Sequence, residues 1–253
     1  MQQNRGKTGN PEKSHAPQPQ GSTTPEKEFG AGFPVVAIGA SARGLEAFEQ
    51  FFSKLPPDSG MAFVLIQHLD PHHKSMLGDL LKRYTPMKVM EAEDGMMLQP
   101  NRVFVIPPNC HLAVHQGKLH LLEPLHSAGL HTPIDYFFRS LARDQKENAV
   151  GIILSGTGSD GVFGLMMIRD EGGMTMVQEP QTARYDGMPR NVLATGSADY
   201  SLPPDKMPEQ LIAYFQHPSD KKYFIGGCFL FCLKNWYLSR SCISGSGFSF
   251  VSV

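Results

Sequence analysis

Short apolar runs alternate along this chain with amphipathic stretches of helical length. The first run covers residues 33–38 and is followed by a Gly-Ala-Ser segment. The stretch after it has apolar side chains on one helical face: Leu45, Phe48, Phe52 and Leu55. The pattern recurs at 61–67, where a strand-like run precedes a polar loop and a helix that Ser75 caps. Similar runs at 150–154 and 174–178 predict two further buried strands.

The segment 89–122 consists of shorter elements. Residues 103–106 predict one strand, and the apolar positions on either side of Gln116-Gly117 predict a hairpin. Three helices are predicted further along the chain, one opened by Thr132-Pro133 and the others at 162–168 and 207–215. Alternating strands and helices favour an α/β fold, in which right-handed crossovers place helices on both faces of a parallel sheet.

Composition divides the chain into one domain and two tails. Residues 1–32 are rich in Pro, Gln, Lys, Gly and Ser and hold few large apolar side chains, which predicts a disordered leader. Residues 33–216 carry the periodic pattern and are expected to form a single domain. Residues 217–253 are rich in Cys, Phe and Ser without clear periodicity, and the sequence assigns them no role.

Charge and cysteine content indicate which kinds of partner and which cellular compartment the sequence favours. The 23 basic residues are balanced by 24 acidic ones, so no positive field favours nucleic acid or an anionic membrane. The most apolar stretch, 223–233, is too short to span a bilayer, and the N-terminus lacks the apolar region of an export signal. Of four cysteines, only Cys110 lies in the middle of the chain, which favours a reducing, cytoplasmic location.

Three reactive side chains follow three predicted strands. Ser41 comes after the first strand, His68 comes after the second, and Asp160 lies in the Gly-rich loop after the strand at 150–154. Functional clefts of open parallel sheets lie at the carboxyl ends of the strands, so the three could converge as nucleophile, base and orienting carboxylate. Each residue also fits an ordinary structural role, as a helix cap, a loop histidine or an Asp-Gly turn.

Neighbouring glycines could support such chemistry. Gly39 is expected to permit a tight turn that presents the Ser41 hydroxyl, and the helix after it would offer free backbone N–H groups to an oxyanion. The glycines of the loop 155–161 would let further N–H groups approach. The loop 179–189 should rim the same cleft, with Arg184 and Tyr185 as candidate substrate contacts.

A series of motifs resembles one known family. In chain order they are Ile38-Gly39-Ala40-Ser41, Gln67-His68, Ile106-Pro107-Pro108 with His111-Leu112, the loop Leu-Ser-Gly-Thr-Gly-Ser-Asp-Gly at 154–161, and Gly187-Met188-Pro189. Through them, residues 35–215 resemble the CheB-type protein-glutamate methylesterases of chemotaxis. The resemblance implies a doubly wound, mostly parallel sheet flanked by helices, in a Rossmann-like three-layer sandwich.

The resemblance also implies a reaction and its residues. Ser41 would be the nucleophile, His68 the general base and Asp160 the carboxylate, with a backbone N–H near Thr157 at the oxyanion and Met188 at the substrate rim. The reaction would be hydrolysis of glutamate methyl esters, and also deamidation of glutamines, on chemotaxis receptors in two-component signalling. It needs no metal or cofactor. A receptor methyltransferase is a further expected partner.

The chain departs from the family pattern in two places. The family usually has Gly-Gly where this chain has Arg43-Gly44, and the long cationic side chain could crowd the nucleophile. Regulated members carry a receiver domain ahead of the esterase, and residues 1–32 are too few to form one. The chain therefore looks like the esterase module of larger hybrid proteins. The non-enzymatic alternative is a module that binds receptor helices or regulates a partner, with its triad blocked by Arg43.

Three other chemistries are weighed against the esterase. A dinucleotide-dependent oxidoreductase is suggested by the segment 39–44 and by the spacing of Tyr84 and Lys88, but Pro86 interrupts any shared helix. A metal site from the side chains around Pro71 would need a spacing that this proline breaks: His68, Asp70, His72 and His73. Cys110 and His111 resemble a thiol dyad, yet neighbours on an extended segment point to opposite faces.

Overall fold

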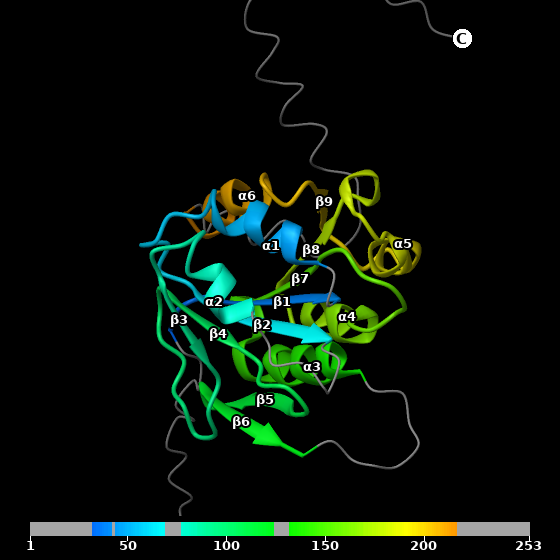
Figure 1. Ribbon diagram of the computed structural model, residues 1–253. Coiled ribbons are helices and arrows are strands. Elements are labelled where there is room, and N and C mark those ends of the chain that lie inside the picture. The colour runs from blue at the N-terminus through cyan, green and yellow to red at the C-terminus, as the bar shows by residue number, and fades with distance from the viewer. Residues whose placement is uncertain (1–31, 42–43, 69–76, 124–131, 217–253) are drawn as a thin grey trace, which may run out of the picture.

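A parallel seven-stranded sheet forms the centre of the computed structural model, which describes residues 32–41, 44–68, 77–123 and 132–216 (Figure 1). The strand order is β3-β4-β2-β1-β7-β8-β9, and all six neighbouring pairs are parallel. The strands are β1 Val35–Ser41, β2 Ala62–His68, β3 Lys88–Glu91, β4 Arg102–Val105, β7 Ala149–Ile153, β8 Met174–Gln178 and β9 Tyr200–Leu202. Apart from residue 32, the predicted leader lies outside the described residues, as does the tail 217–253.

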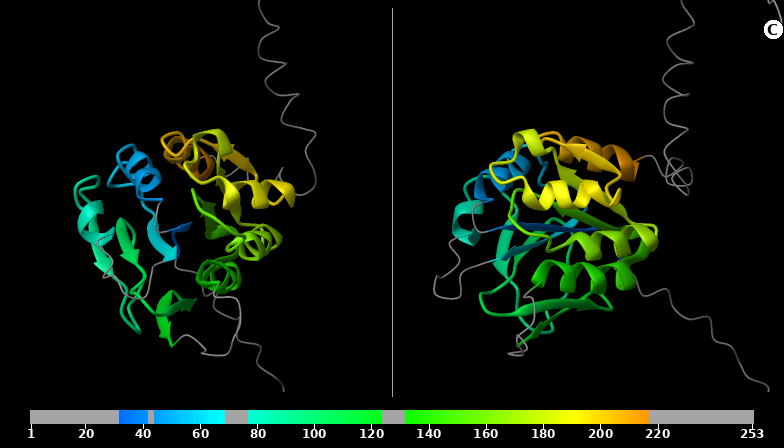
Figure 2. Two further views of the ribbon diagram at one scale, coloured as in Figure 1. Left: turned by 45° about the vertical axis from the view of Figure 1, so that its right-hand side comes forward. Right: turned by 90° about the vertical axis from the view of Figure 1, so that its right-hand side faces the viewer.

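Helices cover both faces of this sheet. The left view of Figure 2 looks nearly along the strands and shows the helices on its two sides. The helices are α1 Leu45–Phe52, α2 Leu77–Leu81, α3 Pro133–Gln145, α4 Val162–Asp170, α5 Gly187–Ala194 and α6 Met207–Gln216. Apolar side chains of α1, α2 and α6 form one core cluster with the sheet, and those of α3, α4 and α5 form the other. The predicted α/β, doubly wound, three-layer fold is confirmed.

The central position of β1 explains why its first four residues, 35–38, are all apolar. Val35 and Ala37 belong to the cluster under α3, whereas Val36 and Ile38 belong to the cluster under α1. All four side chains are fully buried, because a parallel strand with helices on both faces has no solvent side. The continuous apolar run is therefore what a central strand of this sheet requires.

A separate hairpin packs outside α3. It comprises β5 His111–His115 and β6 Lys118–Leu122, and its turn at Gln116-Gly117 is the one that the sequence predicted. Both turn N–H groups donate to the Asp144 carboxylate, at 2.5 and 3.0 Å. The Val114 N–H donates to the Ser140 hydroxyl at 3.0 Å. Side chains of α3 therefore bind backbone N–H groups of the hairpin.

Two edge strands and one helix end differ from the sequence expectation. β3 and β9 were not predicted, because they hold four and three residues and lack a continuous apolar run. The first helix ends at Phe52, so Leu55 lies beyond it although it is buried as expected. Within the described part of the chain, no helix is long and apolar enough to cross a membrane.

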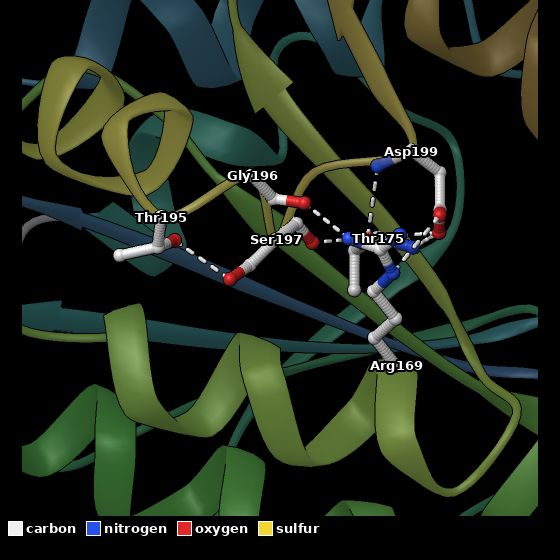
Figure 3. A network of polar contacts seen from close by, with 6 residues as sticks. All are labelled: Arg169, Thr175, Thr195, Gly196, Ser197 and Asp199. Carbon is white, nitrogen blue, oxygen red and sulfur yellow. Dashed lines mark hydrogen bonds and ion pairs between the residues drawn. The ribbon is translucent and has the colours of Figure 1, made fainter. Parts of the chain in front are cut away.

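A polar network secures β9 at the amino-terminal edge of the sheet (Figure 3). The Asp199 carboxylate accepts a hydrogen bond from the Thr175 N–H at 2.8 Å and lies 3.8 Å from the Arg169 guanidinium. Arg169 also donates to the Gly196 carbonyl, and the hydroxyls of Thr195 and Ser197 are 2.6 Å apart. These contacts hold the short strand β9 in place at the edge opposite the predicted site.

Candidate functional site

Ser41 and His68 end two neighbouring strands at the same edge of the sheet. β1 pairs with β2 in parallel, and Ser41 stands directly opposite His68 in the register. The Ser41 N–H donates to the Ser155 carbonyl at 3.2 Å, which joins the end of β1 to the loop after β7. Nucleophile and base candidates therefore come from adjacent strands, and the loop that carries the carboxylate candidate follows the strand on the other side.

Gly156 lets this loop approach Ser41, the nucleophile candidate, closely. A side-chain carbon at Gly156 would lie 3.1 Å from the Ser41 Cβ and 2.1 Å from the Met188 sulfur. The Gly156 N–H donates to the Tyr185 carbonyl, and its carbonyl accepts from the Met188 N–H, both at 2.9 Å. Thr157 follows on the exposed side of the loop. Only glycine fits here without displacing its neighbours.

Gly39 has a role that the sequence did not suggest. The expected turn at Gly39 is wrong, because β1 continues through it to Ser41. A side-chain carbon at Gly39 would lie 2.5 Å from the Ile134 side chain. The glycine instead lets α3 pack closely against β1, and this packing places the start of α3 under the site.

Asp160 is a buried residue of this loop, with 8% of its surface exposed. Its carboxylate accepts hydrogen bonds from the Asp135 N–H at 2.9 Å and the Ile134 N–H at 3.1 Å, in the first turn of α3. In return, the Asp135 carboxylate accepts the Gly164 N–H in the first turn of α4, at 2.7 Å. The Asp160 carboxylate thus satisfies free N–H groups at the start of α3, and the Asp135 carboxylate satisfies one at the start of α4.

Burial also changes the charge behaviour of Asp160. Removal of the carboxylate from water raises its pKa to about 6, and the backbone N–H groups of Asp135 and Ile134 oppose this rise. Burial raises the pKa of Asp135 as well, against the N–H of Gly164. A carboxylate with a raised pKa in a loop that contacts Ser41 is typical of a functional site.

Two residues near the loop were not predicted from the sequence. Gln178 ends β8, is buried, and its side-chain oxygen accepts the Ser155 N–H at 2.8 Å. Its amide also donates to the Thr182 carbonyl at 3.1 Å, so it joins two loops. Asp135 could have been found from its position after Thr132-Pro133, since an acidic residue in the first turn of a helix often binds free N–H groups.

Comparison with known proteins accounts for this arrangement. Residues 36–211 match the family model described as CheB methylesterase. The chain belongs to the CheB methylesterase family. The crystal structure of the Thermotoga maritima CheB methylesterase catalytic domain superposes with a TM-score of 0.66 and 30% identity, covering 72% of this chain and 98% of that one.

The part of this chain that matches its CheB-family relatives covers different shares of their lengths. A Syntrophus aciditrophicus protein-glutamate methylesterase/protein-glutamine glutaminase is 34% identical over 181 residues, 71% of this chain and 52% of that protein. A putative enzyme of the same name from Leptospira interrogans is 30% identical over 191 residues, 75% of this chain and 99% of that protein. The match thus spans about half of the first relative and nearly all of the second.

Of the predicted rim residues of this CheB-family chain, Arg184 and Tyr185 lie between β8 and α5, and Met188 lies in the first turn of α5. Arg184 is exposed and stacks over the Tyr185 ring, with its guanidinium carbon 5.8 Å from the ring centroid. The Tyr185 N–H donates to the Ser155 hydroxyl at 3.0 Å. Met188 is 2% exposed, and its sulfur packs on Gly156. Arg184 is open to a ligand, whereas Met188 supports the loop from below.

Replacing Met188 with alanine is expected to lower both stability and turnover. The cavity left under Gly156 would cost about 2–5 kcal/mol of the free energy of unfolding, and the loop would lose its support beside Ser41. Met188→Leu keeps the volume and should cost less than about 1.5 kcal/mol. Urea unfolding and ester hydrolysis by both variants test this. Normal kcat in a folded Met188→Ala protein would contradict the supporting role.

The raised pKa of Asp160 predicts an acidic limit for catalysis by this CheB-family chain. In the triad that the sequence predicts, only the ionised carboxylate would stabilise an imidazolium at His68, so kcat/KM should fall as pH drops through about 6. A raised carboxyl pKa means that this residue stabilises the fold most below about pH 4, and that this contribution is lost as pH rises through about 6.

The two effects of pH therefore have opposite signs, which separates loss of activity from unfolding at this residue. Rates and circular dichroism, both measured between about pH 5 and about pH 8, test the prediction. A flat kcat/KM over this range would contradict it.

The other chemistries considered for the sequence gain no support. Tyr84 follows α2, whereas Lys88 begins β3, so they share no helix. Burial raises the pKa of the Cys110 thiol, which disfavours a thiolate. Asp70, His72 and His73 lie outside the described residues, and within the described ranges no three His, Cys, Asp or Glu side chains form a metal-binding group.

Proposed function

We propose that this chain hydrolyses methyl esters of glutamate side chains in proteins, as a carboxylic ester hydrolase with the triad Ser41, His68 and Asp160. The pairing of Ser41 with His68 at the ends of adjacent parallel strands carries the proposal. Membership of the CheB methylesterase family and the names of its relatives support the substrate class. Residues 33–216 would form the catalytic domain.

The reaction would proceed through an acyl-enzyme. The Ser41 hydroxyl attacks the ester carbonyl while His68 takes its proton. The tetrahedral oxyanion accepts hydrogen bonds from backbone N–H groups near Thr157. Methanol then leaves with the proton from His68. A water molecule, deprotonated by His68, attacks the acyl group and releases the glutamate carboxylate and Ser41. Asp160 stabilises the imidazolium at each stage.

The same intermediate accommodates a glutamine side chain, with ammonia as the leaving group. The relatives carry both activities in their names, which supports proposing deamidation as the second reaction. The proposed substrates are methyl-accepting chemotaxis receptors, with a receptor methyltransferase as the opposing enzyme. Because the domain holds the single cysteine Cys110, we place the reaction in the reducing cytoplasm.

Methanol release from isolated methylated receptor tests the proposal. Purified chain should release methanol at a rate proportional to enzyme concentration, without added metal or nucleotide. Receptor that carries glutamine at the same positions should release ammonia. A folded protein that binds methylated receptor and releases no methanol would overturn the enzymatic proposal and favour a binding module.

A further inference from the structure

A groove beside the candidate site carries charges of both signs. Its volume is about 490 Å³, and it is lined by residues of α1 and of the segment before α5: Leu45, Glu46, Glu49, Arg184 and Tyr185. The two acidic residues are three positions apart on α1 and therefore lie on one side of that helix. Arg184 and Tyr185 form the opposite wall.

Both walls are held next to the nucleophile by backbone hydrogen bonds. α1 begins at Leu45, and just before it the Gly44 N–H donates to the Ser41 carbonyl at 2.9 Å. On the other wall, the Tyr185 carbonyl accepts the Gly156 N–H at 2.9 Å, and Gly156 packs against Ser41. A protein segment whose ester lies at Ser41 would therefore place neighbouring residues in the groove.

The charges of the groove are available to a ligand. Glu46 is exposed, and Glu49 accepts a hydrogen bond from the Tyr84 hydroxyl, which raises the pKa of that phenol. Among the described residues, no lysine or arginine forms an ion pair with either glutamate. Arg184 contacts the Tyr185 ring, and no carboxylate in the same residue ranges pairs with it.

We propose that this groove selects the glutamate esters that the chain accepts, through the charged residues that flank them. A lysine or arginine side chain of the substrate would lie against Glu46 and Glu49, and a substrate carboxylate would lie against Arg184. Leu45 and the Tyr185 ring would contact the methylene groups of the cationic side chain. The inference rests on the proposed ester hydrolysis and names its specificity determinants.

Short peptides with one glutamate methyl ester test the groove directly. Each peptide carries a single lysine or a single glutamate at one of the positions flanking the ester. For the best lysine position, Glu46→Lys should raise KM by about 3- to 10-fold and leave kcat unchanged, and it should lower KM for the matching glutamate peptide. Glu209→Lys is the matched control, because Glu209 is also exposed in the first turn of a helix.

Binding measurements distinguish an error in the groove proposal from an error in the proposed ester hydrolysis. The same peptides are titrated, by fluorescence anisotropy, against Ser41→Ala protein with and without Glu46→Lys. A charge preference that Glu46→Lys reverses supports the groove even where no ester is hydrolysed, and in that case only the esterase proposal fails. Equal affinity for lysine and glutamate peptides, unchanged by Glu46→Lys, overturns the groove. The preference should weaken in high salt, as expected for exposed charges.

Discussion

Replacement of Ser41 by alanine is expected to abolish measurable methanol release, with a loss of kcat on the order of 10⁴-fold or more. Without the hydroxyl, no acyl-enzyme forms, and water would have to attack the ester directly. Stability should hardly change, because the backbone N–H of Ser41 still donates to the Ser155 carbonyl. Initial rates with methylated receptor, together with urea unfolding, measure both effects.

Covalent labelling gives an independent check on the nucleophile. A serine-directed acylating reagent should add one group to the wild-type chain, and peptide mapping should place it on Ser41. Ser140→Ala is the matched serine control, because Ser140 bonds the hairpin and lies away from the site. Equal rates for Ser41→Ala and wild type would contradict the triad, and labelling that is unchanged in His68→Ala would contradict the proposed base.

Asp160→Ala is expected to lower kcat by ~10³- to 10⁴-fold and also to destabilise the fold. The variant loses the carboxylate that, in the proposed triad, stabilises the imidazolium. It also leaves the N–H groups of Ile134 and Asp135 without their acceptor, at a cost of about 1–3 kcal/mol for each buried donor. Part of this cost is offset near neutral pH, because burial already destabilises the ionised carboxylate in the wild type.

Asp135→Ala separates the two roles of Asp160. Asp135 is buried in the same pair of helix starts and accepts the Gly164 N–H, but it belongs to no proposed triad. Its loss should lower the free energy of unfolding by a similar amount and keep most of kcat in the folded protein. Calorimetry and initial rates below the unfolding transition test the pair. If both variants lose kcat equally, Asp160 acts through the fold rather than through His68.

The sequence alone was enough for the central part of the fold. β1, β2, β7 and β8 are buried by helices on both faces, so each is mostly apolar, and such runs are visible without a structure. The edge strands β3 and β9 were missed for the same reason. They are short and partly exposed, and pairing with a neighbouring strand defines them more than their own residues do.

The candidate site divides in the same way. Sequence position placed Ser41, His68 and Asp160 after separate strands, because reactive side chains of parallel sheets gather at the carboxyl ends. It did not give the register that sets Ser41 opposite His68, since register depends on the packing of whole strands. It also gave a wrong reason for Gly39, whose absent side chain makes room for Ile134.

What the sequence determined by itself is the order of strands and helices along the chain, the apolar faces that they bury, and the residue types of a hydrolytic triad. Only the tertiary structure decided that Asp135 and Asp160 accept hydrogen bonds across the starts of α3 and α4, that Met188 packs against Gly156, and that a charged groove lies between α1 and the segment before α5. These contacts join residues far apart in the chain. No local pattern encodes them, because they depend on how closely two backbones approach when the layers pack.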